Sequence, residues 1–426
     1  MADRHNFASL RAPDTERRPV EDKHHGITRI DDYAWLRADN WQEVFRDPET
    51  LAADIRSHLE AENAYQTELM ADTAELQTRL FQEMKGRIKE DDSSVPMKDG
   101  PFAYGTSFKL GGQQPRYFRT GRDGGEQIII LDGDIEAEGH PYFRLGGVEH
   151  SADHKRLLWG FDDKGSEYFT LRMCYLATGR DGEDTVPDTG GDGVWTADDQ
   201  AFVYTRLDAN HRPSKVFLHR LGTSATEDRL IFEEADPGYF VGVGGTRDNR
   251  WIMISIHDHE TSEYRIVPAD DPLATPKVVS PRATGLQYDL EEGGDVFFIL
   301  TNADGAKDFK IVTAPVSDPS PVNWTELVAH EPGRLILSVI GFEDFMVRLE
   351  RKIGLPRIIV RDRATGEEHI ITFDEEAFSL GLSGSYEYDT DTIRFSYSSM
   401  TTPAQLFDYN MRTRERTLLK TQEVPS

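Results

Sequence analysis

Residues 194–222, VWTADDQAFVYTRLDANHRPSKVFLHRLG, contain the pattern that decides the fold. A polar turn at 196–200 leads into the apolar run 201–205, which is rich in β-branched and aromatic residues. A loop with Pro213 follows, and 215–220 forms a second run of similar length. Aspartates bond the local backbone in turns, and short apolar runs between turns are typical of strands. The stretch therefore predicts a β-hairpin.

The same pattern recurs along the chain, so this hairpin is one of a series. A turn followed by two strand-like runs is found seven times, counting a looser first copy, with a spacing of about 45–55 residues. The paired runs are 101–104 with 116–118, 157–159 with 168–173, 201–205 with 215–220, 251–255 with 264–267, 296–300 with 309–312, 345–347 with 357–360, and 393–397 with 405–409.

A repeat of this length is typical of the blades of a β-propeller. One blade cannot bury both of its faces alone, so blades arranged around an axis bury each other. The sequence therefore predicts a mainly β protein with a seven-bladed propeller. A β-sandwich whose strands are regular by chance is the alternative fold.

The composition excludes several classes of partner. The 426 residues are 38% hydrophobic and 10% aromatic, which is enough for a folded core. The chain has 48 basic and 76 acidic residues, a net charge of −28. An acidic surface repels nucleic acid and anionic lipid and attracts basic peptides, although solubility alone also accounts for it.

The single cysteine and the N-terminus bear on the compartment. Cys174 is the only cysteine, so no disulfide can form within the chain, and its strand-like surroundings indicate a packed thiol. The N-terminus has no apolar signal segment, and no apolar run approaches the length of a membrane span. We expect a soluble, cytoplasmic protein.

The chain divides near residue 90. Residues 1–30 are polar and are expected to form an extended arm. Apolar residues at helical spacing then predict helices, one opening at Pro48 and one spanning 73–88. No long helical pattern follows, so we predict an arm with helices over 1–90 and the propeller over 91–426. Charged segments between blades, such as 178–184, are interpreted as solvated turns.

The sequence contains no recognisable catalytic motif. The string closest to a nucleophile elbow, GLSGS at 381–385, lacks the closing glycine and precedes a strand. The HDHE string at 257–260 resembles a metal cluster, but nothing else in the chain supplies the remaining ligands, and we interpret it as a polar loop. We therefore predict no catalytic residue, no metal and no cofactor in this chain.

Several strings resemble a known family of serine peptidases. The segment DDYAWL at 31–36 and the pair Glu62 and Asn63 resemble the N-terminal segment of the prolyl oligopeptidase family. The strings YSSMTTP at 397–403 and LLKTQEVP at 418–425 are similar to strings of its oligopeptidase B branch. The resemblance covers essentially the whole chain.

The resemblance implies a fold and an activity. In that family a seven-bladed propeller covers an α/β-hydrolase domain with a Ser-Asp-His triad, on which the N-terminal segment packs, and oligopeptidase B members cleave short peptides after Arg or Lys. This sequence stops where the propeller hands over to the hydrolase domain, so it looks truncated. The resemblance therefore implies the gating, substrate-filtering part of such an enzyme, inactive without its hydrolase domain.

Two residues are candidates for a contact with that missing domain. Glu167 resembles an acidic position that pairs with an arginine of the hydrolase domain in several family members, and Arg172 is a weaker candidate of the same sort. A charge pair of this kind could bias opening against closing of the two domains. The alternative interpretation of Glu167 is a solvated turn residue.

Two other functions stay open. A free-standing propeller could act as a scaffold for protein interactions, in which case it needs no docking surface for a second domain. The peptidase interpretation instead predicts an apolar, unpaired face on the propeller and on the N-terminal helices. A propeller enzyme with its own site would need a convergent carboxylate or metal cluster, which the sequence does not reveal.

Overall fold

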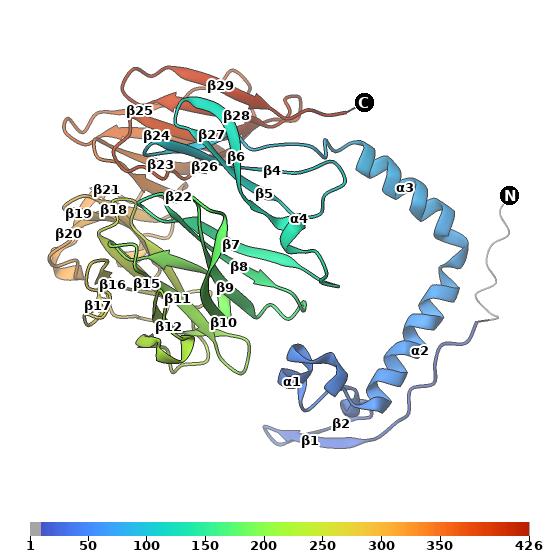
Figure 1. Ribbon diagram of the computed structural model, residues 1–426. Helices are drawn as coiled ribbons and strands as arrows, with labels where there is room; N and C mark the ends of the chain where they lie inside the picture. Colours follow the sequence, from blue (N-terminus) through green and yellow to red (C-terminus); the bar gives the residue numbers. More distant parts are fainter. Residues whose placement is uncertain (1–9, 426) are drawn as a thin grey trace. The chain divides into compact units, whose positions relative to one another are not determined.

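The computed structural model describes residues 10–425, which form two compact units. The first comprises the chain up to Lys89 with the residues after Glu423, and the second comprises Glu90–Glu423. Figure 1 shows helices in the first unit and β-sheets in the second. None of the helices between residues 10 and 425 combines the length and hydrophobicity that a bilayer-spanning helix requires.

The first unit contains a hairpin and three α-helices. The hairpin pairs β1 (Val20–His24) with β2 (Ile27–Asp31), so the arm expected over 1–30 is partly folded. The α-helices are α1 (Trp41–Arg46), α2 (Ala53–Leu69) and α3 (Ala74–Gly86), with short 3-10 turns η1 (Ala34–Leu36), η2 (Pro48–Thr50) and η3 (Ala71–Thr73). The helix predicted to open at Pro48 thus begins after a 3-10 turn.

The second unit consists of antiparallel sheets whose strands follow one another in sequence (Figure 1). Five sheets have four strands each: β3 (Met97–Asp99), β4 (Phe102–Ser107), β5 (Arg116–Gly121) and β6 (Gly124–Asp132); β14 (Phe240–Gly245), β15 (Trp251–His257), β16 (Ser262–Pro268) and β17 (Lys277–Val278); β18 (Tyr288–Gly293), β19 (Val296–Thr301), β20 (Lys310–Pro315) and β21 (Thr325–Val328); β22 (Arg334–Gly341), β23 (Phe345–Lys352), β24 (Leu355–Asp362) and β25 (Glu368–Ile370); and β26 (Ser379–Ser383), β27 (Thr392–Ser398), β28 (Gln405–Asn410) and β29 (Arg416–Thr421).

A sixth sheet has seven strands. They are β7 (Arg144–His150), β8 (Arg156–Asp162), β9 (Phe169–Tyr175), β10 (Arg180–Trp195), β11 (Ala201–Leu207), β12 (Pro213–Arg220) and β13 (Arg229–Glu233). Short helical segments are α4 (Gly133–Glu136), η4 (Ala225–Glu227), η5 (Ala303–Gly305) and η6 (Pro321–Asn323).

All seven predicted hairpins are present, but seven separate blades are not. Each pair of runs found in the sequence pairs in the structure. The number of four-stranded blades is five rather than seven, because β10 joins two of the repeats. Its first part pairs with β9 and its last part with β11, with a register shift between Thr189 and Gly193. The prediction of a mainly β propeller holds, and the count of seven separate blades is wrong.

Three of the turns before the second strand of a repeat share one local design. The hydroxyls of Ser151, Thr196 and Thr246 donate to the aspartate two residues later, at 2.7, 2.7 and 2.6 Å. The residue after each aspartate has a positive φ, which closes the turn. These polar turns connect consecutive antiparallel strands through a short loop.

Apolar clusters hold neighbouring sheets together. Five clusters of buried side chains each join one sheet to the next, from the β3–β6 sheet through to the β26–β29 sheet. A sixth lies within the seven-stranded sheet and spans β10, from Leu158 to Tyr204. Cys174 belongs to the cluster between β6 and β8, and its burial raises the pKa of the thiol to about 12, which confirms the predicted packed thiol.

The sheets of the propeller form a ring, and polar side chains make contacts where its last sheet meets its first. Among residues 10–425, no such apolar cluster joins the β26–β29 sheet to the β3–β6 sheet; we call this junction the seam. Arg394 of β27 donates from Nη1 to the carbonyls of Val95 and Pro96 at 2.9 and 3.1 Å, while its Nε contacts Asp408 at 2.8 Å.

Two further contacts cross the seam. Lys420 of β29 lies 2.7 Å from both carboxylate oxygens of Asp92. Glu387 accepts from Arg122 Nη2 at 2.9 Å and from the backbone N–H of Gly100 at 3.1 Å. Tyr386 also meets Tyr104 of β4 edge-on, with ring centroids 6.1 Å apart, so a few charged side chains and one aromatic pair close the ring.

A buried histidine on β12 links the central strand β10 of the seven-stranded sheet to the segment that precedes its edge strand β13. His219 of β12 is 0% exposed, and its Nδ1 and Nε2 lie 2.7 Å from Asp228 and 3.1 Å from Asp184. Tyr204 donates to Asp228 at 2.7 Å, and Arg206 lies 3.5 Å from it. Burial would lower the pKa of His219, but the hydrogen bonds to Asp228 and Asp184 outweigh it and raise the pKa.

We predict that Arg394→Met weakens the fold through the seam. The change removes two charge-assisted bonds to backbone carbonyls and leaves Asp408 without its partner, so a loss of about 2 kcal/mol in unfolding free energy is expected. Urea unfolding followed by circular dichroism measures it. Arg414→Met is the matched control, because Arg414 forms an exposed pair with Glu367 whose loss costs under about 1 kcal/mol. Equal losses in the two variants would contradict the role of the seam.

We predict that His219 makes the stability depend on pH. Because its folded-state pKa is raised, its stabilisation is complete below the unfolded value of about 6.5 and is lost as the pH rises through the folded value. The urea midpoint of His219→Gln should fall below that of the parent chain by more at pH 6 than at pH 9. His257→Gln, at an exposed site, should show no such trend. A difference for His219→Gln that is constant with pH would refute the prediction.

Candidate functional site in the central cavity

A cavity of about 390 Å³ lies among strands of three neighbouring sheets. Its walls come from the end of β3, from β7, β10 and β14, and from the loop between β26 and β27. Ser385 and Tyr386 of that loop belong to one side of the seam, and Asp99 of β3 belongs to the other. The cavity is therefore bounded by the junction that closes the ring.

The charge in the cavity is mainly negative. Asp99, Glu149 and Asp192 contribute carboxylates to the wall. Glu149 and Asp192 are reached by solvent through the cavity, yet protein surrounds them, and this desolvation raises the pKa of both. Among residues 10–425, no hydrogen bond or ion pair reaches the carboxylate of Glu149. A cation in the cavity would relieve the repulsion between these groups.

The one arginine in the wall is already paired. Arg247 contacts Glu291 and Glu292, each at 2.5 Å, and donates to the carbonyl of Gly341 at 2.5 Å. Burial raises the pKa of Glu291 to about 7, against the opposing effect of the Arg247 charge. Arg247 thus links β14 to the next two sheets and leaves the acidity of the cavity largely uncompensated.

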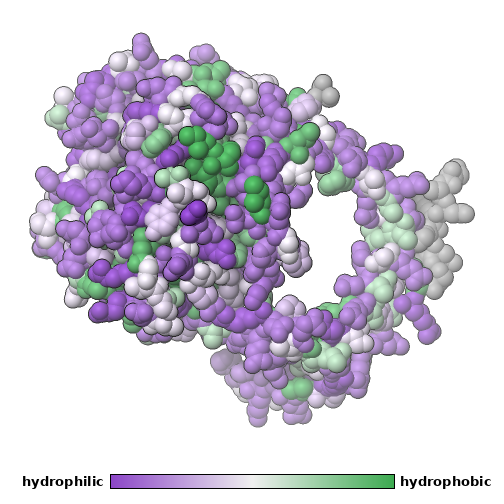
Figure 2. Space-filling model, viewed as in Figure 1, coloured by the Kyte–Doolittle hydropathy of each residue, from purple (hydrophilic) through white to green (hydrophobic). Residues whose placement is uncertain are grey.

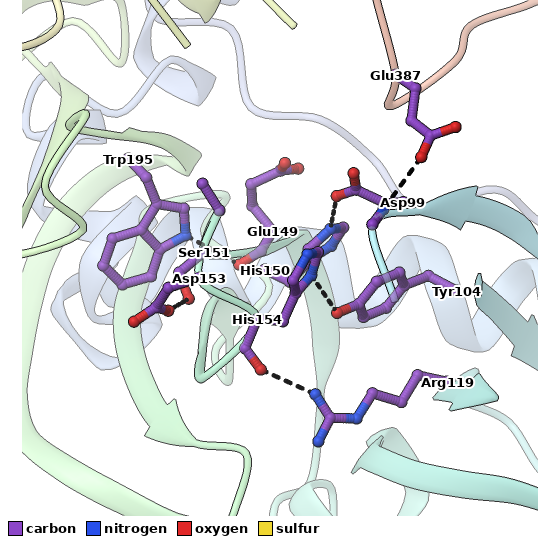
Figure 3. A network of polar contacts seen from close by, with 12 residues as sticks. Asp99, Tyr104, Arg119, Glu149, His150, Ser151, Asp153, His154, Trp195 and Glu387 are labelled. Atoms are coloured by element: carbon purple, nitrogen blue, oxygen red, sulfur yellow. Dashed lines mark hydrogen bonds and ion pairs between the residues drawn. The ribbon is translucent and has the colours of Figure 1, made fainter. Parts of the chain in front are cut away.

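A network of aromatic and imidazole rings lies next to the seam (Figure 3), and His150 and Tyr386 of this network line the cavity. His150 Nε2 lies 2.7 Å from Asp99, and His154 Nδ1 lies 2.9 Å from the hydroxyl of Tyr104. The Tyr104 ring stacks on His150 with centroids 3.7 Å apart, and Tyr386 meets His150 edge-on at 4.9 Å. Arg119 donates to the carbonyl of His154 at 2.8 Å, which fixes the turn that carries it.

Burial affects how these groups titrate. Burial raises the pKa of Tyr104 and of Tyr386 to about 12, so both hydroxyls stay protonated at neutral pH. Burial also lowers the pKa of His154, which keeps that imidazole neutral. The network therefore offers neutral donors and acceptors beside the carboxylates of the cavity.

The predicted gating residues lie elsewhere. Glu167 is in the turn between β8 and β9, where its backbone N–H donates to Asp162 at 2.8 Å and its φ is 59°. Its exposed carboxylate lies 3.6 Å from the exposed guanidinium of Arg144. Arg172 lies over the ring of Phe161 at 4.9 Å and 4.0 Å from Asp181. The role of Glu167 and Arg172 toward a second domain stays a prediction.

The HDHE string begins with His257, the last residue of β15, and continues as a polar loop over 258–260. The carboxylate of Asp258 accepts the backbone N–H groups of Glu260 and Thr261 at 2.7 and 2.6 Å. Within the described part of the chain, the residues grouped closely enough to hold a metal ion are Asp99, His150 and His154 instead. None of these three residues is among the site residues predicted from the sequence.

One signal in the sequence could have found part of this group. His150 and His154 are separated by three residues, a spacing that ligands of one ion often show, but a polar turn before a strand explains the same stretch. Asp99 gives no local signal, because it lies far away in the sequence and approaches through the pairing of neighbouring sheets.

Comparisons with known proteins find relatives that are named as peptidases. Dipeptidyl aminopeptidase BI of Pseudoxanthomonas mexicana is 36% identical over 438 residues, which is 98% of this chain and 59% of that protein. Protease 2 of Moraxella lacunata is 29% identical, over 97% of this chain and 59% of that protein. The structure of oligopeptidase B from Leishmania major matches with a TM-score of 0.89 at 26% identity, over 98% of this chain and 61% of that one.

The chain thus spans about three fifths of the length of these relatives. The family model described as "Prolyl oligopeptidase, N-terminal beta-propeller domain" matches residues 13–422. On this match, the chain belongs to the prolyl oligopeptidase N-terminal β-propeller family.

Proposed function

We propose that this chain is the substrate-filtering part of an oligopeptidase B-like serine endopeptidase that cleaves short peptides after Arg or Lys. Its partner is an α/β-hydrolase domain that carries the catalytic triad, and the chain is inactive without it. One observation carries the proposal: nearly the whole chain matches a propeller family of peptidases, while it spans only about three fifths of its relatives. The cytoplasmic location predicted from the sequence belongs to the same proposal.

The docking surface for the hydrolase domain is supported by exposed apolar side chains on each unit. Helix α3 exposes Leu80, Phe81 and Met84, which recur along one side of the helix. On the propeller, Figure 2 shows hydrophobic side chains gathered over β6, where Ile128 and Ile129 are exposed. Apolar surface of this kind is unfavourable in water and favours a partner that covers it.

The acidic cavity supports the preference for basic peptides. Three carboxylates line a space of about 390 Å³, and Glu149 has no partner among the described residues. A peptide with an arginine or lysine side chain gains attraction on entering such a space, and added salt weakens the attraction. A folded protein is too large for the cavity, so the filter passes short, extended peptides.

We predict peptidase activity only when this chain is combined with a hydrolase domain. The chain alone should not hydrolyse a fluorogenic Arg-terminated dipeptide, whereas a mixture with a separately expressed α/β-hydrolase domain of this family should. The rate of fluorescence release measures it. In the mixture, Glu149→Gln should raise the KM for the Arg substrate several-fold at low salt and leave kcat unchanged. Glu415→Gln, on the exposed surface, is the control.

Each other outcome has a defined meaning. Activity of the chain alone would reveal a catalytic site within it and contradict the proposal. The absence of hydrolysis in both samples, with the chain folded and the hydrolase domain bound, would also contradict the proposal. Failure of the two to associate would favour the free-standing scaffold.

We predict that Glu167 matters for association and little for folding. Because its pair with Arg144 is exposed, Glu167→Gln should change the unfolding free energy of this chain by less than about 1 kcal/mol. The same change should weaken binding of the hydrolase domain several-fold, as measured by calorimetry. Glu183→Gln, at an exposed position of β10, should leave binding unchanged. If Glu167→Gln and Glu183→Gln bind the hydrolase domain equally well, Glu167 does not contribute to the interface.

A further inference from the structure

Three side chains with metal-binding atoms converge at the seam end of the cavity. Asp99 ends β3, His150 ends β7, and His154 lies in the turn that follows. One ligand atom from each lies within 4.8 Å of the other two. Two imidazoles and one carboxylate are a ligand set that suits Zn²⁺ and neighbouring transition-metal ions.

The rings are held in orientations that suit metal binding. When His154 Nδ1–H donates to the Tyr104 hydroxyl, Nε2 keeps its lone pair for a metal, as in established histidine sites. This Nε2 lies close to the backbone of Gly100, the residue after Asp99. Any side chain at position 100 would bring its Cβ to 2.6 Å from the His154 Nε2. Gly100 has a φ of 52°, so a glycine suits both the turn and the close approach.

The surroundings favour a cation and leave a position open. Glu149, which has no partner among residues 10–425, adds negative charge beside His150 and Asp99 (Figure 3). Asp99 and His150 both line the cavity, so a fourth ligand such as water can reach the ion from that side. Metal binding requires a local adjustment: the 2.7 Å hydrogen bond between Asp99 and His150 must open to about 3.3 Å, the separation of two ligands around tetrahedral zinc, and the more distant ligand atoms, now within 4.8 Å of one another, must approach to the same separation.

Other histidines with acidic neighbours do not offer this arrangement. Both ring nitrogens of His219 are engaged by Asp184 and Asp228, and the site is fully buried. In the loop after β15, Asp258 is occupied by backbone N–H groups. The group at the cavity is therefore distinct in having a free imidazole nitrogen, a reachable carboxylate and an open side.

We propose that Asp99, His150 and His154 form a binding site for a divalent transition-metal ion of the Zn²⁺ class, with Tyr104 as a positioning residue. The ion links the β3–β6 sheet to the seven-stranded sheet beside the seam. It thereby holds β3, which lies on one side of the seam, to the neighbouring sheet, and it neutralises part of the acidic cavity wall. The proposal does not depend on peptidase activity.

The test is titration of the untagged, chelator-treated chain with ZnCl2 alone in a weakly coordinating buffer, followed by calorimetry. One equivalent should bind, and His150→Gln and His154→Gln should each weaken binding at least about 100-fold. Tyr104→Phe should weaken it about 10-fold, the usual effect of removing the group that orients a ligand histidine. Zinc should also raise the thermal midpoint of the parent chain, because it binds only the folded form.

His259→Gln is the matched control, since His259 is an exposed histidine beside acidic residues, and it should bind zinc like the parent chain. Circular dichroism establishes that each variant is folded. In the parent chain, Co²⁺ should give the intense visible absorption of a four-coordinate nitrogen and oxygen site, a readout that requires no variant. The absence of a stoichiometric site, binding that His150→Gln and His154→Gln leave intact, or an equal loss in His259→Gln would overturn the proposal.

Discussion

The seam between the β26–β29 and β3–β6 sheets is the constraint on which the structure depends. Every other junction between neighbouring sheets contains a cluster of buried apolar side chains. Burial of apolar surface contributes about 25 cal/mol per Å², so such clusters hold their sheets firmly. At the seam, Arg394, Glu387 and Lys420 make polar contacts, and Tyr386 adds one aromatic contact with Tyr104 at 6.1 Å between ring centroids. A junction of this kind exposes less apolar surface on opening than the other junctions do.

The seam and the cavity form one region. Glu387 accepts the N–H of Gly100, and the neighbouring residues Tyr386 and Asp99 both line the cavity. Any separation of the two sheets therefore changes the cavity wall and the network around His150. This proximity relates the three properties inferred above: a passage for short peptides, an acidic lining that attracts basic ones, and a metal ion that would hold one side of the junction.

The hairpins could be predicted from the sequence because their signals are local. Alternating apolar runs between Asp-rich turns fix each hairpin, whatever the rest of the chain does. The joining of two repeats through β10 could not be predicted, because 178–184 is charged and resembles a solvated turn. In the structure Asp184 is buried and accepts from Gly222 and His219, so tertiary contacts make a strand out of a segment with little strand preference. The group of Asp99, His150 and His154 was missed for a related reason, since its members meet only when neighbouring sheets pack.

Native-state hydrogen exchange of the whole chain tests the role of the seam most directly. The amides of β3 and β26, the innermost strands on its two sides, should exchange through an opening of lower free energy than those of β14, β18 and β22, whose sheets have apolar clusters on both sides. This result would show that the ring opens where charged side chains close it. Equal protection of all five strands, or least protection at β14, β18 and β22, would contradict the account.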